Sequence, residues 1–369
     1  MSTLKVIIAG GGTGGHIFPA VAIGHAIQRL WPGAQLLFVG ALGKMEMEKV
    51  PKEGFTIIGL DIVGFNRSNW LKNITLPIKL IKSRLKAQSI IKDFNPDVVI
   101  GVGGFASFPM LNAAQAKGIP TLIQEQNSYA GKSNKILAQQ AEAVCVAYEN
   151  MGKFFPANKL MLTGNPVRKN ISGSKVTKEA AMQHFGLKND MPTLLIVGGS
   201  LGAQSINEAI DAGLDKLVAA GLQIIWQTGK PYAEKATQRA KSFGSNVLAT
   251  AFIQEMEYAY AAADMVVSRA GALAIAELCI AGKPVIFVPY PHAAEDHQTS
   301  NAIALVNNQA AQIVKDSEVH QQLIGKILEL KDNTTTCTTM ANNILKMAIT
   351  DADERIANKV FDIVKSKKK

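Results

Sequence analysis

The chain has 369 residues, of which 47% are apolar, and a formal net charge of +10. This length favours two domains over one, and the composition excludes a disordered, collagen-like or disulfide-scaffold protein. Three cysteines, Cys145, Cys279 and Cys337, form no CxxC pair and lie in apolar surroundings, which indicates reduced thiols in the cytoplasm.

The N-terminus runs directly into a strand-like segment, without the basic, apolar and small-residue regions of a signal peptide. No stretch reaches the roughly 18 apolar residues that a membrane-spanning helix needs. We therefore expect a protein that is neither secreted nor integral to a membrane.

The first half of the chain alternates short apolar runs with helical patterns. Strands are predicted at residues 4–9, 35–39, 96–101, 120–124 and 143–147, and helices at residues 18–30, 80–94, 110–117 and 132–140. Short apolar strands separated by helices are typical of a parallel sheet that is buried on both faces. The fold class predicted from this pattern is α/β.

A basic and apolar stretch lies within this half. Between residues 62 and 92 there are seven basic residues and no acidic one. Apolar residues such as Phe65, Trp70, Ile81 and Leu85 are interleaved with the charges, so residues 65–85 are predicted to lie on an anionic membrane surface. The alternative is a solvated helix whose apolar side is ordinary core. Binding to nucleic acid is not expected, because no such motif is present and only 6% of the residues are aromatic.

The pattern of the first half begins again near residue 193. Residues 193–197 precede a glycine-rich turn at 198–202 much as residues 6–9 precede the turn at 10–15, which predicts two Rossmann-like units. Further strands are predicted at residues 223–227, 247–249, 265–268 and 284–288. The domains are placed at residues 1–164 and 165–349, and a final helix within residues 350–366 can return to the first domain.

The glycine-rich turn at residues 10–15 suits a diphosphate, because such a turn gathers backbone N–H groups at the positive end of a helix dipole. A dinucleotide enzyme would also carry an acidic residue at the end of the following strand. That strand ends at residues 38–40 and the next acidic residue is Glu46, so hydride transfer is disfavoured.

Another turn joins the strand at residues 264–268 to a helix that opens at Gly271 and carries Glu277. A carboxylate at this depth can accept hydrogen bonds from both hydroxyls of a ribose; the alternative is a solvated helix residue. Arg168, near the seam, can clamp a phosphate or be an ordinary surface arginine.

Seven motifs carry a resemblance to a known family. They are GGTGGHIFP (11–19), GVGG (101–104), EQN (125–127), GNPVR (164–168), SRAGA (268–272), VPYP (288–291) and DHQTSNA (296–302). In order and spacing, over about residues 4–315, the chain resembles the MurG family of glycosyltransferases. The resemblance implies a GT-B fold, in which two Rossmann-like domains face a cleft, the first for the lipid acceptor and the second for the donor.

The activity that the resemblance implies is transfer of N-acetylglucosamine from UDP-N-acetylglucosamine (UDP-GlcNAc) to undecaprenyl-diphospho-N-acetylmuramyl-pentapeptide (lipid I). The product is lipid II, the precursor of peptidoglycan. The enzyme would be peripheral, at the cytoplasmic face of the cell membrane. The β-linked product from an α-linked donor implies single displacement with inversion.

The resemblance also implies roles for individual residues of the donor site. Glu277 would bind the ribose hydroxyls, and the backbone of Ile253 would meet the uracil edge. Ser200 and Arg168 would hold the diphosphate together with the helix start, which comprises Ala272, Leu273, Ala274, Ile275 and Ala276. Asn127 and Gln298 would face the sugar.

On the acceptor side, Thr13, Gly14 and Gly15 would lie near the reacting groups and the acceptor diphosphate. His16 is the candidate general base, since an imidazole titrates in the useful range, although it can instead cap or pack the helix start. Glu125 is the second candidate. No cofactor or metal is expected, because Asp351 and Asp353, the one Asp-X-Asp match, suit the N-terminus of the final helix.

Three positions depart from the family pattern. Phe105 stands in place of a common tyrosine, Gln124 in place of histidine, and Ala274 in place of threonine. Two other functions remain open on the sequence: a UDP-sugar epimerase of the same fold, and a non-catalytic protein that binds nucleotide sugars. The basic stretch disfavours the first, and the presence of His16, Glu125 and Asn127 disfavours the second.

Overall fold

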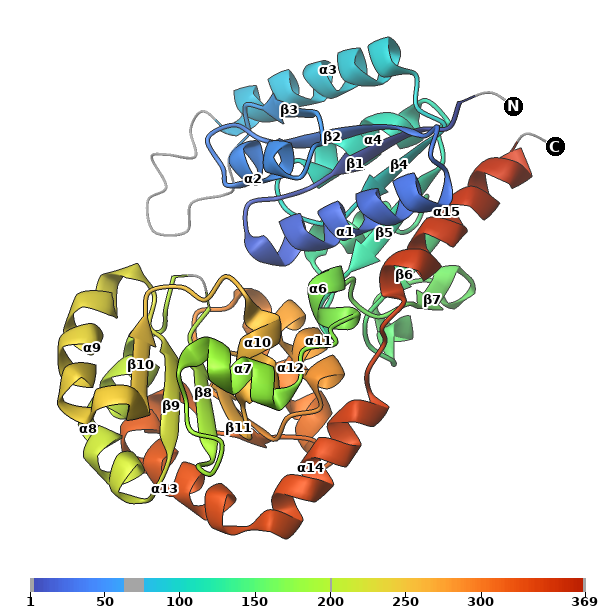
Figure 1. Ribbon diagram of the computed structural model, residues 1–369. Helices are drawn as coiled ribbons and strands as arrows, with labels where there is room; N and C mark the ends of the chain where they lie inside the picture. The colour runs from blue at the N-terminus through green and yellow to red at the C-terminus, as the bar shows by residue number, and fades with distance from the viewer. Residues whose placement is uncertain (1–2, 63–75, 200, 368–369) are drawn as a thin grey trace. The chain divides into compact units, whose positions relative to one another are not determined.

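The computed structural model describes residues 3–62, 76–199 and 201–367. The chain forms two compact units: Met1–Arg168 together with Asp351–Lys369, and Lys169–Thr350. Each unit contains one β-sheet that is covered by helices (Figure 1).

The sheet of the first unit has seven strands, which pair in parallel throughout. Their order across the sheet is β3 (Ile57–Leu60), β2 (Gln35–Ala41), β1 (Lys5–Ala9), β4 (Val98–Gly101), β5 (Thr121–Glu125), β6 (Ala143–Val146) and β7 (Leu160–Leu162). The five strands predicted for this half are confirmed as β1, β2, β4, β5 and β6.

The α-helices of the first unit are α1 (Gly14–Leu30), α2 (Glu46–Lys52), α3 (Leu76–Phe94), α4 (Ser107–Ala116), α5 (Lys132–Leu137) and α15 (Ala352–Lys367). The strands are continuous apolar runs because both sheet faces are buried. Successive residues of β1 point to opposite faces: Ile7 joins a core with α3, α4 and α5, whereas Val6 and Ile8 join a core with α1 and α15.

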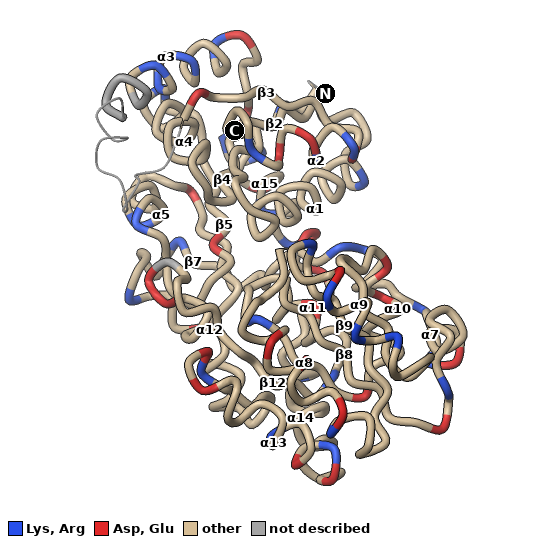
Figure 2. Tube along the Cα trace, turned by 90° about the vertical axis from the view of Figure 1, so that its left-hand side faces the viewer, with Lys and Arg blue, Asp and Glu red and all other residues tan. Residues whose placement is uncertain are grey.

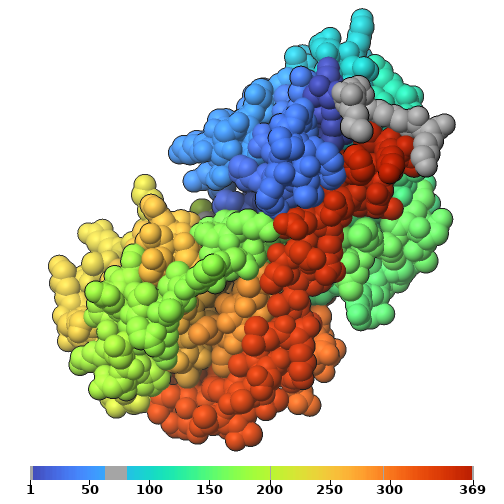
Figure 3. All heavy atoms as spheres, turned by 45° about the vertical axis from the view of Figure 1, so that its right-hand side comes forward, coloured from blue at the N-terminus to red at the C-terminus, as the bar shows by residue number. Residues whose placement is uncertain are grey.

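Helix α15 belongs to the first unit although it lies at the other end of the chain. It packs along α1, where the rings of Trp31 and Phe361 stack with centroids 5.0 Å apart. Arg29 donates to Asp353 at 3.1 Å and to Glu354 at 2.9 Å, in the acidic first turn of α15. Figure 3 shows this helix, in red, against the blue N-terminal segments. The Asp-X-Asp match is therefore part of a helix start that pairs with Arg29.

The sheet of the second unit has six strands, all paired in parallel. Their order is β10 (Val247–Thr250), β9 (Gln223–Gln227), β8 (Thr193–Val197), β11 (Met265–Ser268), β12 (Val285–Phe287) and β13 (Gln312–Ile313). The α-helices are α6 (Lys169–Ser172), α7 (Lys178–Phe185), α8 (Gln204–Ala219), α9 (Ala233–Ala240), α10 (Met256–Ala262), α11 (Ala272–Ala281), α12 (His297–Val306), α13 (Val319–Asp332) and α14 (Thr334–Lys346).

Both sheets share one strand order. In each, the first strand is flanked by the second and the fourth, so the order reverses between β1 and β4 and again between β8 and β11. Ligands of doubly wound folds bind outside the carboxyl ends of the strands at such a switch point. The predicted α/β class with two Rossmann-like units is confirmed, and the switch points direct attention to the glycine-rich turns.

Candidate functional site

A cavity of about 680 Å³ lies at the switch point of the second unit. Residues that follow β8 and β11 line it, together with residues after β12 and the start of α12. They include Gly198, Gly199, Gly202, Gln204, Ser205, Ser268, Arg269, Gly271, Ala274, Tyr290, Gln298 and Asp316. This is the position at which a doubly wound domain holds a nucleotide.

Two helices, α8 and α11, begin at this cavity. Their N-cap residues, Ala203 and Gly271, have extended backbone and make no side-chain capping bond, and neither first turn contains an acidic residue. The first N–H groups of a helix have no partner within the helix and carry the positive end of its dipole. The two helix starts therefore suit an anion such as a diphosphate.

Glycine is required where the loops after β8 and β9 meet. Gly202 has φ of +80°, and a Cβ there would lie 2.1 Å from the carbonyl oxygen of Thr228. No side chain fits that gap, so the backbone of the turn stays close to the neighbouring strand end. The close approach keeps the start of α8 next to the cavity.

Arg269 organises the floor of the cavity. Its Nη1 donates to the carbonyl oxygens of Val288 at 3.0 Å and Pro289 at 3.1 Å, and it pairs with Asp316 at 2.5 Å. Ser205 donates to the same Asp316 oxygen at 2.6 Å. Since Asp316 balances its charge, Arg269 fixes the ends of several strands rather than offering a bare cation. The motif SRAGA contained Arg269, but no sequence signal pointed to Asp316 as its partner.

Of the predicted donor residues, Asn127 and Arg168 belong to the first unit, and the others lie in this unit or outside the described residues. Gln298 lines the cavity and accepts from the backbone N–H of Tyr290 at 2.9 Å. Glu277 lies half-buried on α11 and accepts from the hydroxyl of Tyr260 at 3.0 Å. The N–H of Ile253 donates to the side-chain oxygen of Gln227 at 2.9 Å. Ser200 falls outside the residues that the structure describes.

The predicted positions Ala272, Leu273, Ala274, Ile275 and Ala276 form the first turns of α11, directly after Gly271. Of these, Ala274 lines the cavity. Its side chain is a methyl group, so it offers no hydroxyl to a ligand.

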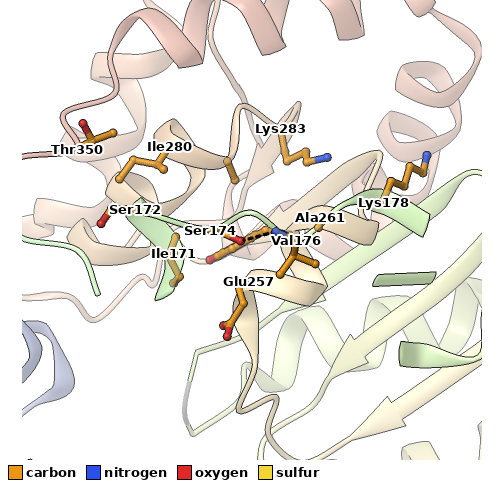
Figure 4. Close-up of a pocket in the computed structure, with 12 residues that line it drawn as sticks. Ile171, Ser172, Ser174, Val176, Lys178, Glu257, Ala261, Ile280, Lys283 and Thr350 are labelled. Atoms are coloured by element: carbon orange, nitrogen blue, oxygen red, sulfur yellow. Dashed lines mark hydrogen bonds between the residues drawn. The ribbon is translucent and has the colours of Figure 1, made fainter. Parts of the chain in front are cut away.

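A second cavity, of about 500 Å³, lies elsewhere in this unit, beside α6, α7 and α10. Lys178, Lys283 and Glu257 contribute its charges, and the Glu257 carboxylate points away from both amines (Figure 4). Burial lowers the pKa of Lys283. None of the predicted site residues lines this cavity, so the cavity at the switch point is the candidate donor site.

The switch point of the first unit brings the turn at residues 10–15 against the loop after β4. The N–H of Gly11 donates to the carbonyl oxygen of Gly103 at 3.2 Å, and a Cβ on Gly104 would lie 2.1 Å from the oxygen of Gly11. Thr13, Gly14 and Gly15 follow at the start of α1. The two loops are thus in backbone contact, which only glycines permit.

His16 lies over this contact. Its Nδ1 is 3.1 Å from the carbonyl oxygen of Gly11 and 3.4 Å from the hydroxyl of Thr13. A carbonyl oxygen only accepts, so the contact assigns the proton to Nδ1 and the basic lone pair to Nε2. A Cβ on Gly103 would lie 2.8 Å from Nε2, which places that nitrogen directly above the glycine loop.

Glu125, the second candidate base, ends β5 and is buried. Its carboxylate accepts from Asn127 through the backbone N–H at 3.2 Å and the side-chain amide at 3.4 Å. It also accepts from the N–H of Gly131 at 3.1 Å and the side chain of Asn134 at 2.9 Å. These contacts fix the loop that carries Asn127, so the geometry favours a positioning role for Glu125.

Gln124, which stands where the family commonly has histidine, takes part in a buried amide network. It donates to the side-chain oxygen of Asn165 at 3.0 Å, and Asn165 donates to the carbonyl oxygen of Gln126 at 3.0 Å. The network joins the EQN and GNPVR motifs. Arg168 is the last residue of the GNPVR motif. Its guanidinium lies 5.5 Å from the ring centroid of Phe18 on α1.

Helix α3 presents an exposed basic and apolar surface. Ile81 and Leu85 are 62% and 60% exposed, and Lys82, Arg84 and Lys86 beside them are exposed as well. Figure 2 shows the basic positions along this helix in blue. Residues 65–75 of the predicted membrane stretch lie outside the described residues. Of the helices that the structure describes, none is long and apolar enough to cross a membrane.

Comparison with known proteins shows similarity along the whole chain. The N-terminal domain model of glycosyltransferase family 28 matches residues 6–146, and the C-terminal domain model of that family matches residues 193–356. A Cytophaga hutchinsonii protein is 53% identical over 99% of this chain and 98% of its own length. Its name is UDP-N-acetylglucosamine--N-acetylmuramyl-(pentapeptide) pyrophosphoryl-undecaprenol N-acetylglucosamine transferase, and a Bacteroides fragilis protein of the same name is 52% identical over 98% of this chain and 96% of its own.

Solved structures agree with these relatives. MurG from Acinetobacter baumannii has a TM-score of 0.79 and 31% identity, over 97% of this chain and 99% of its own. A UDP-GlcNAc 2-epimerase from Neisseria meningitidis has a TM-score of 0.68 at 17% identity, over 97% of this chain and 100% of its own, and shares only the fold. Near-complete coverage at about half identity, with both family domains in order, identifies the chain as a member of the MurG family, within glycosyltransferase family 28.

Proposed function

We propose that this chain transfers N-acetylglucosamine from UDP-GlcNAc to lipid I and thereby forms lipid II. The observation that carries this function is the cavity at the β8–β11 switch point, where two helix starts converge, in a chain about half identical to transferases of that name. The fold alone does not identify the function, because an epimerase shares it. The function is therefore argued from the residues of the site.

In the donor site, the starts of α8 and α11 hold the diphosphate of UDP-GlcNAc. Glu277, oriented by the hydroxyl of Tyr260, accepts from the ribose hydroxyls. The backbone at Ile253 meets the uracil, and Gln227 then exchanges its bond to that N–H for the ligand. Gln298 faces the sugar from the start of α12. Asn127 at the sugar, and Arg168 and Ser200 at the diphosphate, stay predictions from the family resemblance.

The chemical step is a single displacement. The acceptor hydroxyl attacks the anomeric carbon, the bond to the UDP oxygen breaks, and His16 takes the hydroxyl proton on Nε2. Charge grows on the leaving diphosphate in the transition state. The helix starts are fixed dipoles aimed at that charge, so they stabilise the transition state without reorganising.

The acceptor arrives from a membrane surface. Thr13, Gly14 and Gly15 at the start of α1 lie near its diphosphate, and α3 contacts anionic headgroups through its exposed lysines and arginine, with Ile81 and Leu85 inserted among them. The enzyme is then peripheral, at the cytoplasmic face of the cell membrane.

The test follows UDP-GlcNAc by NMR with and without a short-chain lipid I analogue. A transferase consumes the donor only when the acceptor is present. Conversion of the donor without acceptor would favour the epimerase, and binding without any conversion would favour a non-catalytic protein.

The donor site is tested by Glu277→Ala in the same assay. Loss of the ribose contact is expected to raise the donor KM about 10- to 100-fold, since a hydrogen bond to a charged group contributes about 1.5–3 kcal/mol. Glu234→Ala, an exposed acid on α9, is the matched control. Equal donor KM values in the two variants would remove Glu277 from the site.

A further inference from the structure

Glu46 is the first acidic residue after β2, in the part of the chain where a dinucleotide-binding domain carries the acid that binds ribose. It begins α2 and is only 1% exposed. An ionised carboxylate at such depth is costly unless it is hydrogen-bonded. Its partners therefore indicate what it does.

The two oxygens of Glu46 accept from backbone N–H groups. Oε2 accepts from Gly12 at 2.7 Å and Oε1 accepts from Ala41 at 2.9 Å. One bond lies in the glycine-rich turn and the other at the end of β2. Charge-assisted bonds of this kind are shorter and stronger than neutral ones. Because both oxygens are engaged, Glu46 does not present a carboxylate to a ribose in this structure.

The surrounding backbone leaves room for this side chain. Gly11 has φ of +140°, and a Cβ there would lie 2.3 Å from the carboxyl carbon of Glu46. A Cβ on Gly40 would lie 2.5 Å from its Cγ. Side chains at either position would displace the carboxylate. The turn thus holds an internal anion where a nucleotide-binding turn would face a diphosphate, in agreement with a donor site in the second unit.

One peptide group connects Glu46 to His16. The N–H of Gly12 and the carbonyl of Gly11 belong to the same planar unit, so fixing one end fixes the other. Glu46 accepts from the N–H end, and Nδ1 of His16 lies 3.1 Å from the carbonyl oxygen. A carboxylate at the N–H end also polarises the peptide, which makes its oxygen a stronger acceptor.

We propose that Glu46 is a positioning residue for the transfer reaction, acting on His16 through the Gly11–Gly12 peptide. The inference rests on the proposed role of His16 as the base. No proton moves along this path: the carboxylate orients the peptide, the peptide holds the imidazole with its proton on Nδ1, and Nε2 accepts the proton of the acceptor hydroxyl. The arrangement does for this histidine what a direct carboxylate partner does in other enzymes.

The other charged groups on the elements around Glu46 contact other partners or are exposed. On α1 and α2, the pairs are His25 with Glu53, Arg29 with Asp353 and Glu354, and Lys52 with Glu48; Arg168 lies over Phe18, and Lys44 and Lys49 are exposed. Among the groups whose contacts are described, Glu46 is the carboxylate that accepts a hydrogen bond from the Gly11–Gly12 peptide, and the carbonyl oxygen of this peptide contacts His16.

The test is a double-mutant cycle of Glu46→Gln and His16→Ala, with transfer to the lipid I analogue as the assay. Glutamine keeps the shape but replaces one acceptor with a donor, so it loses a bond to the backbone. Glu46→Gln is expected to lower kcat about 10-fold or more, a part of the roughly 10²–10⁴-fold that a general base contributes. The donor KM stays within about twofold, and the acid limb of the kcat/KM profile moves to lower pH, because the imidazole becomes less basic.

In the His16→Ala background, Glu46→Gln is expected to have no further effect on kcat, since residues that act as a unit are not additive. Glu48→Gln, an exposed acid on the same helix, is the control and leaves the kinetics unchanged. Glu46→Asp keeps the charge and is expected to retain more activity than the glutamine variant. If Glu46→Gln does not fold, Glu46→Asp replaces it in the cycle.

The proposal is overturned if the effects of Glu46 and His16 multiply, or if the pH profile of the Glu46 variant is that of the wild type. Failure of the base assignment is a separate result: His16→Ala alone would then retain kcat. If the proposed transferase function itself is wrong, the wild-type chain will not transfer N-acetylglucosamine to the lipid I analogue.

Discussion

The sequence offers two candidates for the general base near the glycine loops of the first unit, His16 and Glu125. Glu125 is buried and accepts four hydrogen bonds, from Asn127, Gly131 and Asn134, which occupy both of its oxygens. His16 has Nδ1 fixed by the Gly11 carbonyl and keeps its basic lone pair on Nε2. The geometry favours His16 as the base and Glu125 as the residue that positions Asn127.

This assignment predicts the effect of His16→Ala. We expect kcat to fall by about 10²-fold or more, as for loss of a general base, with the donor KM nearly unchanged. His25→Ala on the same helix, half-exposed and paired with Glu53, is the control. Steady-state kinetics of transfer measure kcat and the donor KM. A fall in donor affinity with kcat retained would assign His16 to binding instead.

The cysteines give a second prediction at this scale. Burial raises the pKa of Cys145 and of Cys279 to about 12, so almost no thiolate is present at pH 8. Iodoacetamide is therefore expected to leave both unmodified in the folded chain and to alkylate them in urea. Mass spectrometry of tryptic peptides measures this. Rapid labelling of Cys145 without denaturant would show that the core between the first sheet and helices α1 and α15 is open.

Sequence patterns predict single site residues unevenly. The glycine turns, Glu277 and Gln298 carry local signals, and the structure places Gln298 and Ala274 at one cavity. The partner of a residue has no such signal when it lies far along the chain. Asp316 is 47 positions from Arg269, and Glu46 is 34 positions from Gly12, so only folding brings these pairs together.

At the scale of elements, continuous apolar runs predict the buried strands well, because parallel strands are covered on both faces. Three edge strands lack that signal, because β3, β7 and β13 are only partly buried. Helix α1 begins at Gly14 rather than near residue 18. Its first turn opens with two glycines and Pro19 follows, so helix propensity does not reveal this start. Helix α2 contains Pro51 and has only 7 residues, so periodicity does not reveal it.

Helix α15 makes a prediction about stability. Ile356 is fully buried in the core that also holds Ile8 and Ile23, so Ile356→Ala is expected to cost about 2–5 kcal/mol through lost burial and a cavity. Urea unfolding of the first unit measures the change. The exposed Asn358→Ala is the control on the same helix. Equal midpoints for the two variants would mean that α15 does not stabilise this core.

At the scale of the whole molecule, the charge of +10 and the surface of α3 bear on where the enzyme works. Exposed lysine and arginine next to exposed isoleucine and leucine suit the proposed binding to anionic lipid, through electrostatic attraction and insertion. In the alternative interpretation, the helix is only solvated and its surface does not bind lipid. For residues 81–86 the structure shows that the basic and apolar side chains are exposed, and binding to lipid stays a prediction.

We therefore predict that Lys82→Glu with Arg84→Glu weakens binding to vesicles of anionic lipid. Each basic residue near the surface contributes about 1 kcal/mol, so the pair is expected to cost at least 10-fold in partition. Sedimentation with vesicles measures the bound fraction, and Lys216→Glu with Lys315→Glu, at exposed sites in the second unit, serves as the matched control. Equal loss in both double variants would indicate a general charge effect.

The most direct measurement of the central claim is transfer of labelled N-acetylglucosamine from UDP-GlcNAc to a short-chain lipid I analogue, with the product analysed by mass spectrometry and NMR. We predict a lipid-dependent product that is heavier by one N-acetylglucosamine and has a β linkage, from inversion at the anomeric carbon. A chain that binds the donor but labels no lipid acceptor, or gives an α linkage, would contradict the account.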